Sequence, residues 1–370
     1  MYRGPVWVSD IYQVNCMPSE DRPSGDRPTN DRKKGRVTLL DVAQRANVSR
    51  ATASLVIRKS PLVGVETRAR VEEAMRELGY VYNMGAARLR AERSHTVGVV
   101  VPNLTNPFFA ELLSGIESVI DEAGMVVILA NSGDLAERQD MVMRRLREHG
   151  VDGVILCPAA GTGADFLKRV DEWNLPLVQV LRHISEDMDY AGVDYSGGIR
   201  QAVDHLASLG HRTIAFAVHG PIHSAYHERV EGFRETMQSR GFRADLIIRM
   251  PDQTAQIPAA APLLFSGAEK PTAVICFNDV LALGLTAGLY DLGLKVGENF
   301  SLIGFDDVAE AEVIRPRLTS VSTAPVAIGE NAAKLLLDRL ADPSLPPRKV
   351  VKATHLHIRQ SCASVAEVLL

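Results

Sequence analysis

An internal repeat constrains the fold of this 370-residue chain more than any other feature. Thr96, Gly115 and Gly124 recur 117 positions later as Thr213, Gly232 and Gly241. Each set begins at a predicted strand, crosses a predicted helix and ends at a glycine, and further apolar runs follow at 153–157 and 273–277. Because strands that alternate with helices predict a parallel sheet, the repeat predicts two similar Rossmann-like α/β lobes.

The first lobe shows this alternation in detail. Apolar runs predict strands at 97–101, 126–129 and 153–157, and helical periodicity predicts helices at 108–123 and 138–149. Lobes of this kind bind ligands at the carboxyl ends of their strands, and two lobes that face each other enclose a cleft. The body of the chain is therefore predicted to be a two-lobed ligand-binding fold.

A helical segment precedes the lobes, from Val37 to Leu89. Thr38 and Asp41 form a capping pair that predicts a short helix starting at Thr38. Ser49 can cap a second helix over 50–57, and a third helix over 66–78 should end at Gly79. Because a short turn joins the first two helices, the segment is predicted to be a helix-turn-helix.

The second helix has one apolar face and one outward face. Ala53, Val56 and Ile57 fall at positions i, i+3 and i+4 and are predicted to face inward. The outward positions are Arg50, Ala51, Ser54 and Leu55. They lie in the N-terminal half, where a recognition helix meets base edges in the major groove. An ordinary three-helix structural bundle is the alternative interpretation, because it explains the buried positions equally well.

The charge is distributed unevenly along the chain. A net charge of −4 would argue against a nucleic-acid partner if it were spread evenly. Residues 32–93 contain 14 Lys and Arg against 6 Asp and Glu, a net charge of +8, while residues 1–31 have −2 and the remainder has −10. A basic segment on an acidic body is typical of a protein that presents one end to DNA phosphates. The alternative, a solvated charged helix face, fits short charge runs better than this asymmetry.

The residues of this segment also match a known pattern, in the runs 37–43, 48–52, 67–71, 78–80 and 83–89. Together these runs resemble the headpiece of the LacI/GalR family, the lactose and purine repressors. In that family the stretch 83–90 is a hinge helix ordered on DNA, and Leu89 matches the leucine that enters the minor groove. This agrees with the way apolar wedges kink DNA. The resemblance implies DNA contacts from Thr38, Ser49, Arg50, Ala51, Thr52, Ser54, Leu55, Asn83, Arg88 and Leu89.

Two positions of the headpiece depart from the family pattern. Family members usually have Val at position 53 and Arg at position 55, where this chain has Ala53 and Leu55. The common arginine contact to guanine is therefore missing. For this reason the family pattern does not predict the operator sequence.

The resemblance extends through the lobes to about Cys362, with marks such as Gly304-Phe305-Asp306-Asp307. It implies that the lobes exchange strands near Val193 and Val321 and that the chain returns to the first lobe after Ser322. It also implies effector contacts at the ends of strands and on the helix after the Thr213 strand. The implied effector-binding residues are Phe108, Phe109, Arg229, Asn278 and Asp306.

One position of this implied site departs from the family. The family often places Asp before Arg after the strand 177–180, whereas this chain has Leu181-Arg182. The loss of the carboxylate removes a sugar-hydroxyl acceptor and would leave Arg182 uncompensated. The resulting hypothesis is an anionic effector, such as a sugar acid or another carboxylate, held by Arg182 and Arg229.

Other reactive side chains give no further site. Cysteines 16, 157, 276 and 362 show no CxxC spacing, and those in strands are read as reduced core residues. His219, His223 and His227 have zinc-like spacing, but Gly220 and Pro221 would break a helix there, so they are predicted to be loop histidines. We expect no metal, no cofactor and no catalytic residue.

These features predict five segments: a disordered N-terminal extension (1–36), a helix-turn-helix domain (37–82), a hinge helix and linker (83–94), a two-lobed effector-binding and dimerisation domain (95–362) and a tail (363–370). The predicted function is a homodimeric, sequence-specific DNA-binding repressor of a pseudo-palindromic operator, controlled by a sugar, sugar acid or related metabolite. No apolar run could span a membrane and no signal-peptide core is evident, which favours the cytoplasm. The rival is a two-lobed solute-binding protein or a sugar-processing enzyme.

Overall fold

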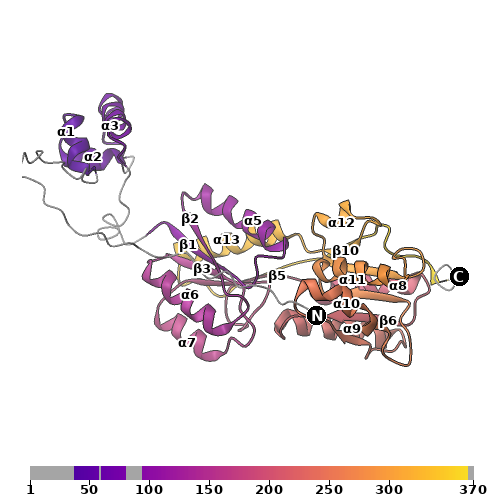
Figure 1. Cartoon of the computed structure of the whole chain (residues 1–370). Coiled ribbons are helices and arrows are strands. Elements are labelled where there is room, and N and C mark those ends of the chain that lie inside the picture. The colour runs from indigo at the N-terminus through magenta and orange to yellow at the C-terminus, as the bar shows by residue number, and fades with distance from the viewer. Residues whose placement is uncertain (1–36, 58–59, 81–93, 366–370) are drawn as a thin grey trace, which may run out of the picture. The chain divides into compact units, whose positions relative to one another are not determined.

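The computed structural model describes residues 37–57, 60–80 and 94–365 of the chain. The chain divides between Met84 and Gly85 into two compact units, and Figure 1 labels many of their helices and strands. The predicted N-terminal extension and the predicted contacts of Asn83, Arg88 and Leu89 lie outside the described residues.

The first unit contains the helices α1 (Leu39–Arg45), α2 (Arg50–Ile57) and α3 (Val65–Leu78). The capping pair is confirmed: Thr38 is the N-cap, so α1 begins one residue later than predicted, and the Asp41 carboxylate accepts a hydrogen bond from the Thr38 backbone N–H at 2.7 Å. The Ser49 hydroxyl caps α2 by accepting from the Thr52 N–H at 3.0 Å. Helix α3 ends at Gly79, whose φ of 61° is left-handed, as expected for a glycine C-cap.

Small side chains form the core of this unit. Ala53 and Val56 of α2 are buried as predicted, whereas Ile57 is only half-buried. The remaining buried residues are Val42, Ala43, Ala46, Val71 and Ala74. Because small residues let the helix axes approach closely, a short segment can still bury a continuous interior.

The first lobe of the second unit is a six-stranded sheet in the order β11-β5-β4-β3-β1-β2. Every pair in it is parallel. Its strands are β1 (Thr96–Val101), β2 (Val126–Asn131), β3 (Gly153–Leu156), β4 (Leu177–Val180), β5 (Tyr190–Val193) and β11 (Lys349–Lys352). Its helices are α5 (Phe108–Glu122), α6 (Ala136–Glu148), α7 (Ala164–Glu172) and α13 (Pro325–Ala341).

The second lobe repeats this architecture, with the strand order β12-β10-β9-β8-β6-β7. Its strands are β6 (Ile214–Val218), β7 (Ile247–Arg249), β8 (Ala273–Cys276), β9 (Ser301–Asp306), β10 (Thr319–Ser322) and β12 (His355–His357), of which β12 is antiparallel to β10. Its α-helices are α8 (Tyr195–Ser208), α9 (Ser224–Ser239), α10 (Ile257–Ala260), α11 (Asp279–Asp291) and α12 (Glu310–Val313), with short 3₁₀ turns at Thr254–Gln256 and Ala261–Phe265. The predicted fold class, two parallel-sheet α/β lobes, is confirmed.

The repeated glycines explain why the two lobes share a pattern. Gly115 lies on α5 where that helix meets α13, and a Cβ at this position would come 2.0 Å from the Val326 backbone oxygen. Gly232 lies on α9, where a Cβ would come 2.8 Å from the Ser196 Cα of α8. Each lobe therefore uses a glycine to bring two helices into close contact.

Three crossings join the lobes. The chain leaves the first sheet after β5 and the second sheet after β10, as expected near Val193 and Val321. Helix α13 then packs on α5, so this yellow C-terminal segment lies within the magenta lobe of Figure 1. The predicted return to the first lobe after Ser322 is confirmed by α13 and β11, and the chain then crosses once more to add β12 to the second sheet.

The cores of the two lobes consist mainly of buried apolar side chains. Cys157 and Cys276 are buried and reduced, as expected for cysteines in strand-like runs, and Cys362 is partly buried and also free. Within the described ranges, no helix combines the length and the apolar character needed to cross a membrane.

Candidate functional site

The outward side of α2 is the first candidate surface. Ser49, Arg50 and Ala51 are exposed at its N-terminal end, and Thr52, Ser54 and Leu55 are partly exposed. The side chains of Thr38, Ser49 and Thr52 are engaged in helix caps, which leaves them at the surface. This arrangement presents the start of α2 to a partner, as a recognition helix requires.

A cavity of about 560 Å³ is the second candidate site, and residues of both lobes line it. It lies at the carboxyl ends of the strands, where parallel sheets bind ligands. The structure brings all six predicted effector residues to its wall: Phe108, Phe109, Arg182, Arg229, Asn278 and Asp306. Whether they bind an effector stays a prediction.

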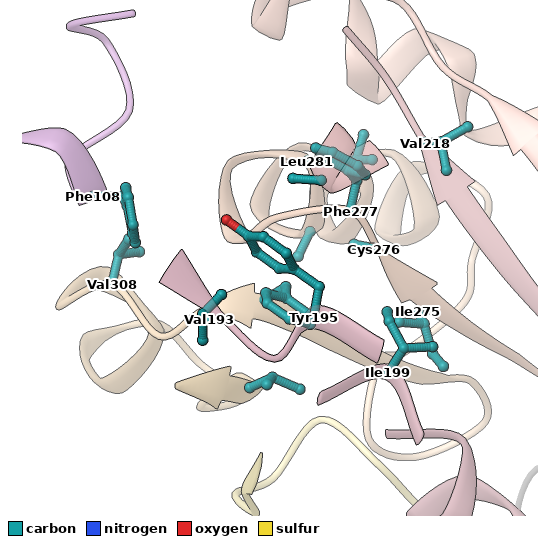
Figure 2. Close-up of a cluster of buried hydrophobic side chains, with 14 of the residues drawn as sticks. Phe108, Val193, Tyr195, Ile199, Val218, Ile275, Cys276, Phe277, Leu281 and Val308 are labelled. Atoms are coloured by element: carbon teal, nitrogen blue, oxygen red, sulfur yellow. The ribbon is translucent and has the colours of Figure 1, made fainter. Parts of the chain in front are cut away.

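Arg229 is held on α9 by aromatic rings. Its guanidinium carbon lies 4.0 Å from the centre of the Tyr195 ring, 4.4 Å from that of Phe277 and 4.6 Å from that of Phe305. Figure 2 shows Tyr195 and Phe277 among the buried hydrophobic side chains, with the Tyr195 hydroxyl pointing away from Ile199. Only 7% of the Arg229 side chain is exposed, so the rings stabilise the buried cation through cation–π contacts. Arg229 is therefore not a surface residue that pairs with a neighbour on its own helix, since Glu231 pairs with Arg234 instead.

The Arg229 guanidinium has hydrogen-bonding capacity left for a ligand. Its Nη2 is 3.8 Å from Asp306 Oδ1, which gives attraction without a direct hydrogen bond. Its buried Nε has no hydrogen-bond partner among the described residues. Because an unpaired buried donor is unfavourable, this group favours a ligand acceptor in the cavity.

Asp306 lies at the end of β9 and is 6% exposed. Its backbone has a φ of 107°, which turns the chain sharply at the cavity wall. The carboxylate accepts a hydrogen bond from Asn106 Nδ2 of the first lobe at 3.3 Å. Burial raises the pKa of Asp306 to about 6, and the Arg229 charge limits the rise.

Arg182 is not uncompensated, and this premise of the anionic-effector hypothesis is wrong. Its Nη1 and Nη2 donate to the two carboxylate oxygens of Asp134, at 2.6 and 3.1 Å. Nη1 also donates to the Pro158 carbonyl at 3.1 Å. The carboxylate missing at position 181 comes instead from the loop after β2, a long-range pairing that local sequence does not reveal.

Asn278 has a structural role as well as a place in the cavity. Its side-chain oxygen caps α11 by accepting from the Leu281 N–H at 2.9 Å, and it lies 3.1 Å from His219 Nε2. Any effector contact would therefore use its amide nitrogen. Phe108 and Phe109 begin α5 and meet edge to face, with ring centres 5.4 Å apart, so they form an apolar wall.

The sequence reasoning missed Asp134, Tyr195, Phe277 and the role of the histidines. His219 and His223 line the cavity in the predicted loop, and burial lowers the pKa of both, that of His223 to about 2. His227, by contrast, lies on α9 and not in a loop, because His223 is the N-cap of that helix. Asn278 was implied by the resemblance, and His219 and Phe277, which directly follow the buried strands β6 and β8, could have been found by their position at strand ends.

Within the described residues, no cluster of three or more His, Cys, Asp or Glu side chains could hold a metal ion. The cavity instead combines aromatic walls with hydrogen-bonding groups from both lobes. This chemistry suits a small polar molecule.

Two family models match the chain. Residues 38–83 match the model described as bacterial regulatory proteins, lacI family, and residues 203–362 match that of the periplasmic binding protein-like domain. The first match covers α1 to α3, and the second covers most of the second lobe together with α13 and β11.

Relatives match the headpiece and body together. The HTH-type transcriptional repressor PurR of Vibrio vulnificus is 32% identical over 316 residues, which cover 82% of this chain and 92% of the relative. The structure of the lac repressor dimer bound to operator and the anti-inducer ONPF superposes with a TM-score of 0.79 at 25% identity, covering 88% and 99% of the two chains. The structure of a complex of the transcriptional regulator CelR with cellobiose superposes with a TM-score of 0.66 at 31% identity, covering 88% of this chain and 100% of that chain.

These relatives are transcriptional regulators and not enzymes. Because one sequence relative above 30% identity is matched over nine-tenths of its length, the likeness covers a whole regulator and not only a shared body. The chain therefore belongs to the LacI family of bacterial regulatory proteins and is a DNA-binding transcriptional regulator.

Proposed function

We propose that this regulator is a repressor whose affinity for its operator is set by a small polyhydroxyl molecule bound in the cavity between the lobes. The observation that carries this proposal is the hydrogen bond from Asn106 Nδ2 to Asp306 Oδ2, which joins the two lobes across the cavity. A ligand that contacts both residues would change the position of one lobe relative to the other. Binding can therefore be coupled to a distant DNA-binding surface.

The chemistry of the wall supports a sugar or related metabolite. Carboxylate and guanidinium groups can hydrogen-bond hydroxyls in pairs, and the rings of Phe108 and Phe277 can cover the apolar face of a sugar ring. A solved relative carries cellobiose, which is a sugar. Phe108, Phe109, Arg182, Arg229, Asn278 and Asp306 are the proposed effector contacts.

The DNA-reading surface is proposed to be α2 together with the segment that follows the headpiece. Arg50, Ala51, Ser54 and Leu55 would face the major groove, aided by Thr38, Ser49 and Thr52 near the backbone. Leu89, with Asn83 and Arg88, would act at the minor groove. If Leu89 is a wedge, Leu89→Ala should weaken specific binding and leave nonspecific binding nearly unchanged.

The regulator is proposed to act as a homodimer in the cytoplasm. A solved relative is a dimer on its operator. In this chain β2 is the edge strand of the first sheet, and its Val126 is 64% exposed, so an apolar surface is available for a second copy. A two-fold dimer presents two headpieces, so it should bind a pseudo-palindrome.

Selection of DNA from randomised duplexes with the purified protein tests this proposal. We expect a palindrome of about 14 to 20 base pairs with a deformable central step. Binding that recovers no motif and only weakens as salt rises would mean phosphate contacts alone, and would contradict sequence-specific repression by the free protein.

A further inference from the structure

We propose that Asp134 is a specificity-determining residue of the effector cavity, which selects a neutral polyhydroxyl molecule over its carboxylate analogue. This inference rests on the proposed function of the cavity. It assigns a role to a residue outside the six sequence-predicted contacts.

Asp134 is held in place by several hydrogen bonds. Its two carboxylate oxygens accept hydrogen bonds from the two terminal nitrogens of Arg182, and Oδ1 also accepts one from the Ala160 backbone N–H at 2.9 Å. Only 19% of the Asp134 side chain and 13% of the Arg182 side chain are exposed. A bidentate pair of this kind fixes the orientation of the guanidinium plane.

The neighbouring backbone explains why this carboxylate comes from another loop. Leu181 has a left-handed φ of 64°, and its carbonyl accepts hydrogen bonds from the hydroxyls of Tyr190 and Tyr195, at 3.3 and 3.2 Å. The buried Leu181 side chain offers no charge to its neighbour. Asp134 therefore supplies the compensating charge from across the cavity wall.

The consequence is that each arginine among the described residues of the cavity wall has a carboxylate close to it. Arg182 is paired with Asp134, and Arg229 lies 3.8 Å from Asp306. Arg249 lies 3.3 Å from Asp252, the other acidic residue of the wall. His219 and His223 add no charge at neutral pH, because burial lowers the pKa of both. A carboxylate would meet carboxylates in this cavity, whereas hydroxyls can donate to them.

The test compares matched neutral and acidic sugars on wild type and Asp134→Asn. The probes are glucose with glucuronate, galactose with galacturonate, ribose with ribonate, and cellobiose with cellobionate, screened by thermal unfolding and measured by isothermal titration. We expect wild type to prefer a neutral member, and Asp134→Asn to shift the affinity ratio toward the acid by about tenfold or more, since Arg182 is then unpaired. Asp140→Asn removes a carboxylate that pairs with Arg169 and does not line the cavity, so it should leave the ratio unchanged.

A second variant distinguishes the loss of the carboxylate charge from a general disturbance of folding. Leu181→Asp in the Asp134→Asn background returns a carboxylate beside Arg182, so it should restore the preference for the neutral sugar. An unchanged ratio in Asp134→Asn, or a wild-type preference for the acids, would overturn the inference while leaving a sugar-responsive regulator intact. If no probe stabilises wild type or Asp134→Asn, both the proposal of a sugar effector and this inference are rejected. If no probe stabilises wild type but the acids stabilise Asp134→Asn, the role of Asp134 is supported.

Discussion

Arg229 shows how a buried cation can be held ready for a ligand. Three aromatic rings surround its guanidinium within 4.6 Å, and the Asp306 carboxylate lies 3.8 Å away, beyond hydrogen-bond distance. The rings stabilise the charge without using its N–H donors. A ligand oxygen can therefore satisfy donors that the protein leaves unused.

Replacing Arg229 by Ala should lower the affinity for an identified sugar by tenfold or more, because hydrogen bonds to a charged donor are worth about 1.5 to 3 kcal/mol. Isothermal titration measures the change. Arg234→Ala is the matched control, since Arg234 lies on the same helix, is exposed and pairs with Glu231. Unchanged affinity in Arg229→Ala would remove this residue from the site.

The buried Asp306 carboxyl should make stability depend on pH. Its pKa rises from 3.8 in the unfolded chain to about 6 in the fold, so the folded state favours the protonated form. The free energy of unfolding of wild type should therefore fall by about 2 to 3 kcal/mol relative to that of Asp306→Asn as pH rises from about 4 to above 6.

Chemical denaturation at several pH values measures this difference in the free energy of unfolding. A difference that is constant with pH would contradict the raised pKa. One that changes in the opposite direction would indicate that the Arg229 charge outweighs burial.

At the scale of elements, helix α5 takes part both in the helix packing of the first lobe and in the wall of the cavity. The helix begins with Phe108 and Phe109 at the cavity and crosses α13 at Gly115. Gly329 of α13 makes the reciprocal approach, because a Cβ there would come 2.2 Å from the Leu112 backbone oxygen. The position of the aromatic wall therefore depends on this close crossing.

Gly115→Ala should destabilise the body by about 1 to 3 kcal/mol, because the new methyl would overlap the Val326 backbone and force the helices apart. Urea unfolding followed by circular dichroism measures the effect. Gly163→Ala is the matched control: a Cβ there meets nothing within 4 Å, and its φ of −107° suits alanine. Equal stability of the two variants would show that α5 and α13 can move apart at their contact without a loss of stability.

Most elements could be predicted from sequence because their signals are local. The capping pair of Thr38 and Asp41, the left-handed Gly79 and the apolar runs of β1 and β3 each lie within a few residues. Strand β12 and the partner of Arg182 could not be predicted, because they depend on contacts between distant parts of the chain. The six predicted residues of the cavity wall came from the family resemblance, whereas Asp134 reaches the wall through its pairing with Arg182, which no local pattern indicates.

At the scale of the whole molecule, the three crossings between the lobes define the possible motion. Short connections after β5, β10 and β11 join two bodies that each have their own sheet, so the lobes can rotate as units. Contacts that bridge them, such as Asn106 with Asp306 and the His183 N–H with the Ser224 hydroxyl at 2.9 Å, would change with that rotation. A ligand that favours one arrangement can thereby bias DNA binding.

The most direct test is operator affinity, measured by fluorescence anisotropy with and without a saturating sugar, in wild type and in Arg229→Ala. The operator comes from the selection experiment and the sugar from the paired screen. The sugar should change wild-type operator affinity by about fivefold or more, as a coupling of about 1 to 3 kcal/mol implies, and should change that of Arg229→Ala little. Wild-type affinity that a bound sugar leaves unchanged, or an equal change in both proteins, would contradict control of DNA binding from this cavity.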